Sequence, residues 1–199
     1  MTPSDPEALQ VAFRVLELLQ RFGIAYHLGG SYASAIHGIP RQTHDVDLVI
    51  DLGPEHISEI VRALEGEFYV DEHAVARAVS ERSSANLVHF ATGVKVDLFV
   101  KGNSAFDSSE FRRRVVVRLG DESPRDVFVK SAEDTVLRKL HWFRLGGEVS
   151  DRQWQDVRGI VSVQGKRLDV DYLTRWADQL GVRDLLDRVL TEGSITPAP

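Results

Sequence analysis

Two aspartates one residue apart lie in an apolar, β-branched run, which constrains the fold more than any other feature of the chain. The run is His44-Asp45-Val46-Asp47-Leu48-Val49-Ile50. Its composition predicts a β-strand. Because side chains alternate along a strand, Asp45 and Asp47 share one face and the apolar residues at even positions share the other. Acids on such a strand are costly unless they bind something, so the run predicts a sheet with one ligand-binding face.

The spacing of these carboxylates suits divalent cations. Residues two apart on a strand are about 6.5–7 Å apart at Cα, and carboxylates at that spacing can converge on two cations about 3.5–4 Å apart. A later predicted strand, residues 94–100, carries Asp97 between Val96 and Leu98. We therefore predict Asp45, Asp47 and Asp97 as metal ligands and catalytic residues.

A glycine turn lies upstream of the acidic strand. Gly29-Gly30-Ser31 follows a predicted short strand, residues 24–28, and precedes a predicted helix, residues 32–37. Backbone amides at a helix N-terminus bind phosphate, and glycines let the phosphate approach closely. Ser31 adds a hydroxyl donor. Arg41, just before the acidic strand, is a candidate phosphate contact, although a surface role fits it equally well.

Periodicity and turn residues divide the chain into a mixed part and a helical part. The predicted helices and strands of the mixed part are helices 6–21, 32–37 and 54–64 and strands 24–28, 44–50, 86–92, 94–100, 115–119 and 127–130. Residues 71–85 and 102–111 are predicted as loops or short helical turns. From Ser131, which opens a capping-box variant with Asp134, the chain is helical over 131–145, 151–163, 172–180 and 184–190. The last six residues are expected to fray.

This order predicts an α+β fold. Residues 1–130 are predicted to form an α/β core, a mixed sheet with helices on one face, and residues 131–199 a C-terminal helical region packed on that core.

Composition narrows the setting. The chain has 199 residues, a formal net charge of −6 and no cysteine, which excludes disulfides and thiolate zinc sites. The acidic start lacks the features of a signal peptide, and no apolar run approaches membrane-spanning length, so we expect a cytoplasmic protein without membrane contact. The net charge argues against broad capture of nucleic acid. The run 112–114 (Arg-Arg-Arg) is a candidate basic patch or a solvated strand edge.

The arrangement resembles the polymerase-beta-like nucleotidyltransferase superfamily. The matching residues are Leu28-Gly29-Gly30-Ser31, then Asp45-Val46-Asp47-Leu48, then Val96-Asp97-Leu98. The resemblance covers roughly the first two-thirds of the chain. It implies a mixed sheet followed by helices, with acids that hold two Mg²⁺ ions against a nucleoside triphosphate.

The last third is similar to bacterial nucleotidyltransferases related to abortive-infection toxins. Ser131-Ala132-Glu133-Asp134 and the following Lys139 carry this match. The resemblance implies that Lys139 reaches the nucleotide phosphates and that a downstream acid, Asp151 or Asp156, is functional. Alanine stands at position 132 where the relatives have proline, and Arg144 falls short of the expected arginine position.

The leading hypothesis is a Mg²⁺-dependent nucleotidyltransferase. It moves a nucleoside monophosphate from an NTP to a hydroxyl acceptor, which is a small molecule, a protein or a tRNA, and releases pyrophosphate. The alternative is a catalytically silent module that binds a nucleotide, or a partner protein encoded nearby, in a toxin–antitoxin type of system. Transfer of the γ-phosphate is a third possibility.

Overall fold

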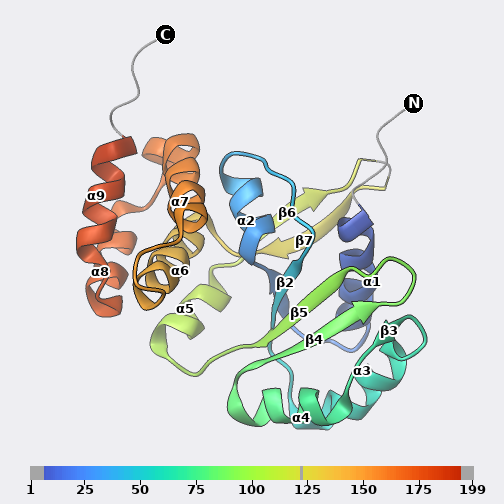
Figure 1. The fold of residues 1–199 in the computed structure, drawn as a ribbon. Coiled ribbons are helices and arrows are strands. Elements are labelled where there is room, and N and C mark those ends of the chain that lie inside the picture. Colours follow the sequence, from blue (N-terminus) through green and yellow to red (C-terminus); the bar gives the residue numbers. More distant parts are fainter. Residues whose placement is uncertain (1–6, 122, 194–199) are drawn as a thin grey trace. The chain divides into compact units, whose positions relative to one another are not determined.

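A mixed β-sheet is the framework of the computed structural model, which describes residues 7–121 and 123–193 (Figure 1). The strands are β1 (Tyr26–Leu28), β2 (Val46–Ile50), β3 (Phe68–Tyr69), β4 (Ser84–His89), β5 (Lys95–Val100), β6 (Val115–Leu119) and β7 (Arg125–Val129). They form one seven-stranded sheet in the order β3-β4-β5-β2-β1-β7-β6. The pairs β2–β5 and β1–β7 are parallel, and the other neighbours are antiparallel. The predicted α+β class is therefore confirmed.

The helices follow the predicted alternation, with further helices where loops or turns were expected. The first part contains α1 (Glu7–Arg21), α2 (Gly30–His37), the 3₁₀ turn η1 (Pro54–His56), α3 (Ile57–Leu64), α4 (Glu72–Glu81) and α5 (Ala105–Arg112). The second part contains α6 (Ala132–Leu145), α7 (Asp151–Gln164), η2 (Gly165–Arg167), α8 (Val170–Leu180) and α9 (Arg183–Gly193). None of these helices within the described ranges is long and apolar enough to cross a membrane.

The described chain divides into two compact units. The first comprises the described residues up to Tyr32 together with Gln42–Val129, and it contains the whole sheet. The second comprises Ala33–Arg41 and the described residues from Lys130 onward. The sequence-based division at residue 130 assigned 33–41 to the first part, whereas the structure groups this segment with the C-terminal helices.

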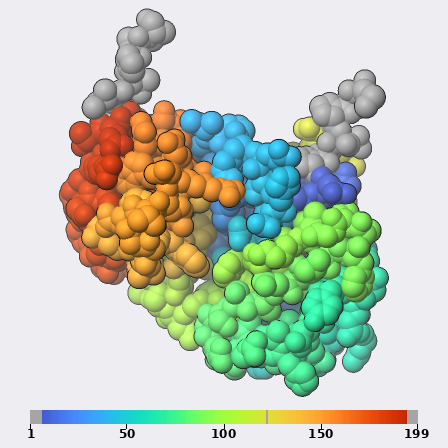
Figure 2. Space-filling view, viewed as in Figure 1, coloured from blue at the N-terminus to red at the C-terminus, as the bar shows by residue number. Residues whose placement is uncertain are grey.

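The sheet has one buried face and one face that carries the acids. Val46, Leu48 and Ile50 of β2 are at most 1% exposed, and their neighbours Val96 and Leu98 on β5 are at most 2% exposed. The helices α1 and α4 contact the sheet through β2, β4 and β5, and α3 packs against both helices. Because strand residues alternate, Asp47 and Asp97 point to the opposite face. The cyan and green atoms of α3, α4 and β4 form one continuous surface in Figure 2.

The second unit is built around a buried carboxylate. Ser131 caps α6, since its hydroxyl oxygen accepts from the backbone N–H of Asp134. The Asp134 side chain, which is fully buried, accepts from the Ser131 hydroxyl and the Tyr172 hydroxyl, each at 2.6 Å. These bonds tie the start of α6 to α8, so the predicted capping-box variant also serves as a tertiary contact.

The segment 33–41 joins the second unit through close backbone packing. A Cβ on Gly38 would lie 2.8 Å from the backbone nitrogen of Ile160 on α7, so only glycine fits there. The Gln164 side chain donates to the carbonyl of His37, and His37 Nε2 lies 2.7 Å from the carbonyl of Lys130. In Figure 2 blue atoms of this part of the chain lie beside the orange atoms of α7.

Two segments expected as loops or turns are full helices. The α4 helix begins after Asp71, whose side chain accepts from the backbone of His73 and Ala74. The α5 helix begins after Ser104, which forms a complete capping box with Asp107. The two-residue strand β3 was not predicted. Residue 6, where the first helix was predicted to begin, and the tail from residue 194 lie outside the described residues.

We expect Tyr172→Phe to destabilise the second unit by about 2 kcal/mol, because the buried Asp134 carboxylate loses one of its hydrogen-bond donors. All three tryptophans belong to this unit, so their fluorescence during urea unfolding follows it. Tyr69→Phe, at a side chain that is 61% exposed, is the control and is expected to leave the free energy of unfolding unchanged. Equal stability of the two variants would contradict this role for Tyr172.

Candidate functional site

Asp47 and Asp97 lie side by side on neighbouring strands. The parallel register of β2 and β5 pairs Asp47 with Asp97, so both carboxylates leave the same face of the sheet. Paired strands are about 4.8 Å apart, a distance that two carboxylates can bridge through a shared cation. Asp45 immediately precedes β2 and is exposed, so the strand begins at residue 46, two residues later than the predicted start at 44. The site is therefore built on two central strands of the first unit.

The glycine turn is fixed directly against Asp47. The Gly29 backbone N–H donates to the Asp47 carbonyl at 2.8 Å, which extends the β1–β2 pairing by one bond. Gly30 then begins α2 with a φ of +51°. A Cβ at Gly30 would lie 1.7 Å from Asp47 Oδ2 and 2.4 Å from its Cγ, so glycine is required by the approach of this side chain. The predicted phosphate turn and the predicted metal ligand are thus in contact.

Lys95 is a site residue that the sequence interpretation missed. Its Nζ lies 2.9 Å from Asp97 Oδ2, and its side chain leaves the same face of β5 two residues earlier. Continuing the β2–β5 register by one residue places Asp45 opposite Lys95. The alternation Lys95-Val96-Asp97 could have revealed this neighbour, because residues i and i+2 of a strand share a face.

All three acids raise the pKa of the same side chain, Lys95. The pKa of the Lys95 ammonium lies above its ordinary value, first because of its hydrogen bond to Asp97 and then because of the charges of Asp97, Asp45 and Asp47. These effects outweigh the opposing effect of burial. A single cationic group thus senses all three carboxylates.

The donor set fits a hard divalent cation. Carboxylate oxygens are the ligands that Mg²⁺ prefers, and the Lys95 ammonium already stands among them as a positive charge. Within residues 7–121 and 123–193, no three histidine or acidic side chains converge closely enough to hold a metal ion. In the described residues the carboxylates of Asp45, Asp47 and Asp97 therefore do not form a ready-made metal cage.

Arg41 and Lys139, predicted as phosphate contacts, meet in the second unit at Asp156. Arg41 donates to both carboxylate oxygens at 2.8 and 2.9 Å, and Lys139 Nζ lies 2.8 Å from Oδ2. The Asp156 side chain is 7% exposed. Burial raises the pKa of Asp156, but hydrogen bonds and charges from Arg41 and Lys139 lower it further, so it lies below its ordinary value. The other candidate, Asp151, is exposed at the start of α7.

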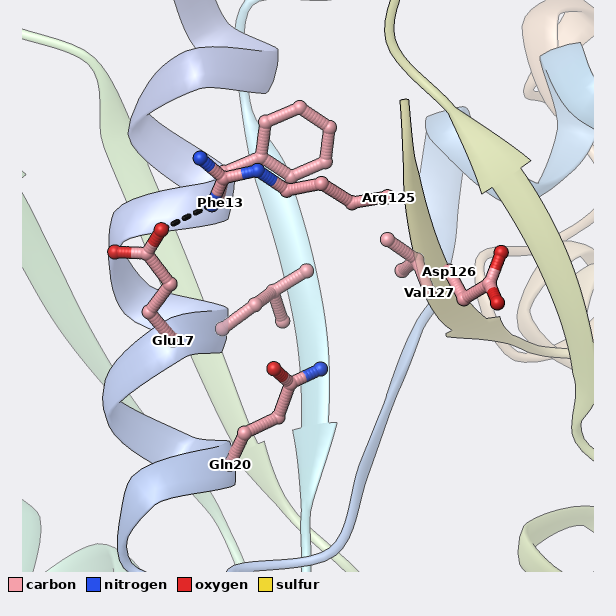
Figure 3. Close-up of a pocket in the computed structure, with 7 residues that line it drawn as sticks. Phe13, Glu17, Gln20, Arg125, Asp126 and Val127 are labelled. Atoms are coloured by element: carbon pink, nitrogen blue, oxygen red, sulfur yellow. Dashed lines mark hydrogen bonds and ion pairs between the residues drawn. The ribbon is translucent and has the colours of Figure 1, made fainter. Parts of the chain in front are cut away.

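A pocket of about 320 Å³ lies between residues of α1 and of β7 (Figure 3). It is lined by Phe13, Leu16, Glu17, Gln20, Arg125, Asp126 and Val127. Glu17 of α1 forms an ion pair with Arg125 of β7. The sheet register gives Val127 the same face as Leu28 and Leu48, which is opposite to that of Asp47. This pocket is therefore separate from the candidate site.

The arginine run is partly used in packing. The Arg114 guanidinium lies over the rings of Phe111 and Phe128, 4.7 and 4.8 Å from their centroids. It also donates to the carbonyl of Phe111. These contacts give Arg114 a structural role that a simple solvated edge would not require.

The fold is that of known nucleotidyltransferases. One similar structure, ANT(2")-Ia in complex with adenylyl-2"-tobramycin, has a TM-score of 0.54 and 11% identity and covers 89% of this chain and 99% of its own. A solution structure of the antibiotic-resistance factor ANT(2'')-Ia has a TM-score of 0.50 and 13% identity, with coverages of 85% and 93%. An antigenic nucleotidyltransferase-like protein from Paracoccidioides brasiliensis has a TM-score of 0.53 and 17% identity, with coverages of 96% and 95%.

No protein-family model matches the sequence, and no curated protein matches it either. The structural likeness confirms the nucleotidyltransferase type of fold expected from the glycine turn and the acidic strand. The roles of Asp45, Asp47, Asp97, Gly29, Gly30, Ser31, Arg41 and Lys139 stay predictions.

We expect Gly30→Ala to destabilise the first unit more than Gly93→Ala does. Both glycines have positive φ, which costs an L-residue about 1–2 kcal/mol, but nothing lies within 4 Å of a Cβ at Gly93. Alanine at Gly30 must also displace the Asp47 carboxylate. Thermal unfolding followed by circular dichroism measures both variants, and equal losses would show that Gly30 is not in contact with Asp47.

We expect Asp156→Asn to cost about 3 kcal/mol of stability at pH 7, because two cations lose a buried partner. The folded pKa of Asp156 is below its unfolded value near 3.9, so its contribution is fully present above about pH 4 and is lost as the pH falls through the folded pKa. The difference from wild type should therefore shrink in acid.

Urea unfolding followed by tryptophan fluorescence at pH 7 and at about pH 3 measures this difference. Asp151→Asn removes an exposed acid from the same helix and is expected to change stability by less than about 0.5 kcal/mol. A cost for Asp156→Asn that does not depend on pH would contradict the ionised pair.

Proposed function

We propose that the protein is a metal-dependent nucleotidyltransferase, which moves a nucleoside monophosphate from an NTP to a hydroxyl acceptor. The observation that carries this proposal is the contact of the glycine turn with Asp47, beside Asp97, on a sheet with the nucleotidyltransferase fold. The glycine turn is suited to bind a triphosphate, and the two carboxylates are suited to bind divalent cations.

Asp45, Asp47 and Asp97 are the proposed ligands of two Mg²⁺ ions. When bound, these ions neutralise charge on the triphosphate and stabilise the attacking and leaving oxygens. Asp47 has the central position, because its backbone anchors Gly29 while its side chain faces both Gly30 and Asp97. Movement of this one residue would disturb the phosphate turn and the metal ligands together.

The amides at the start of α2 and the Ser31 hydroxyl are the proposed phosphate donors. Gly29 and Gly30 present backbone without a Cβ, so a phosphate can approach closely. In the second unit, Arg41 and Lys139 are two cationic groups held by one buried carboxylate. We include them in the proposal as phosphate-binding residues, with Asp156 as the group that orients them.

In the proposed reaction, the acceptor oxygen forms a bond to the α-phosphorus and the bond from that phosphorus to the β-phosphate oxygen breaks. Asp97 accepts the proton of the acceptor hydroxyl, and pyrophosphate leaves with the electrons of the broken bond. The tobramycin adduct in the similar structure is an acceptor that already carries an adenylyl group. It supports a small-molecule acceptor for this chain, and a protein or a tRNA stays an alternative acceptor in the proposal.

We expect the wild-type protein to transfer label from an α-labelled NTP with Mg²⁺ to an acceptor in a cell lysate, and Asp47→Asn to lower this transfer by at least 10²-fold. Asp51→Asn is the control, because Asp51 lies just beyond β2 and pairs with Lys101 outside the site. It should retain nearly full activity.

Parallel reactions with γ-labelled NTP separate the alternatives. Label that reaches the acceptor only from the γ-position would replace nucleotidyl transfer with a kinase-type reaction. Nucleotide binding without transfer from either position, with all four nucleotides, would favour the silent binding module.

A further inference from the structure

Lys95 is a cation paired with one of the three proposed metal ligands. Its ammonium lies 2.9 Å from Asp97 Oδ2, and its position on β5 faces Asp45 by register. The Asp97 side chain is 13% exposed, whereas that of Lys95 is 41% exposed. The acid is therefore held on the sheet, while the lysine has room to move.

An ammonium and a divalent cation compete for the same oxygen. A lysine side chain is a compact charge on a flexible four-carbon stem, so it can leave Asp97 without any change in the backbone. Its departure gives up an ion pair and leaves a free positive charge beside the acids. Metal binding must offset the lost ion pair and the repulsion by the freed ammonium. The nucleotide-free protein therefore binds metal more weakly.

A bound triphosphate changes this balance. It adds negative charge beside the acids, next to the Gly30 turn that contacts Asp47. The displaced ammonium then has anionic oxygens to face in place of Asp97. Metal and nucleotide therefore favour each other's binding, and the coupling is reciprocal.

We propose that Lys95 is a resident counter-ion of the acidic site, which a divalent cation displaces from Asp97, and that it makes metal binding depend on bound nucleotide. This inference rests on the proposed function, because it takes the three acids as metal ligands. Lys95 acts on the metal through Asp97, by competing for its carboxylate, and takes no part in bond breaking.

Mn²⁺ binding tests the inference without a measurement of activity. Free Mn²⁺ is followed by electron paramagnetic resonance during titration of the full chain, with and without an α,β-methylene NTP that cannot transfer its nucleotide. We expect Lys95→Met to lower the Kd for Mn²⁺ about tenfold in the absence of nucleotide. We also expect the tightening caused by the nucleotide to shrink in this variant.

Lys101→Met is the matched control, since it removes the same charge from the residue just after β5 but breaks a pair with Asp51 instead. It should leave Mn²⁺ affinity within twofold of wild type. Lys95→Gln keeps a polar side chain and should behave as Lys95→Met does. Circular dichroism verifies that all variants are folded.

Asp97→Asn distinguishes an error in the role of Lys95 from an error in the proposed metal ligands. If it weakens Mn²⁺ binding but Lys95→Met and Lys95→Gln do not tighten it, the metal site stands and the role of Lys95 is wrong. If wild type and Asp97→Asn bind Mn²⁺ equally, or neither binds it, the metal ligands of the proposed function are wrong and the inference fails with them.

Discussion

The parallel pairing of β2 with β5 is the constraint on which the candidate site depends. It sets Asp47 beside Asp97 and buries Val46, Leu48, Val96 and Leu98 on the other face. A register shift of one residue would send the acids into the apolar layer, where unpaired carboxylates are costly. The burial of the apolar face therefore also fixes the position of the acids, and the same packing energy supports both the core and the site.

Asp47 links the sheet to the glycine turn, and Asp156 has a comparable role in the second unit. Each is a carboxylate against which other groups are fixed: Gly29 and Gly30 at Asp47, and Arg41 and Lys139 at Asp156. The two differ in their partners. Asp156 pairs with two cations within its own unit, whereas the charges of three acids on the sheet act on one ammonium, that of Lys95.

Local patterns were enough to predict most of the elements. The valine-rich run of β6 was predicted with its observed bounds, because β-branched residues between turn signals leave little alternative. The segments of α4 and α5 were predicted only as loops or short helical turns; the starts of these helices depend on the caps Asp71 and Ser104, and α5 has only weak apolar periodicity. The grouping of Ala33–Arg41 with the C-terminal helices had no local signal, since it depends on the packing of Gly38 against α7.

The sequence by itself determined that Asp45 and Asp47 precede or lie on a strand with one apolar face, that a glycine turn precedes them, and that Asp97 lies on a later strand. Alternation and turn chemistry are local properties, so one sequence is sufficient to show them. Only the tertiary structure decided that Asp97 lies beside Asp47 and that Gly30 contacts Asp47. It also decided that Lys95 pairs with Asp97 and that Lys139 pairs with Asp156. Except for the local Lys95–Asp97 spacing, these contacts join residues far apart in the chain. Strand register and helix packing decide which of them meet.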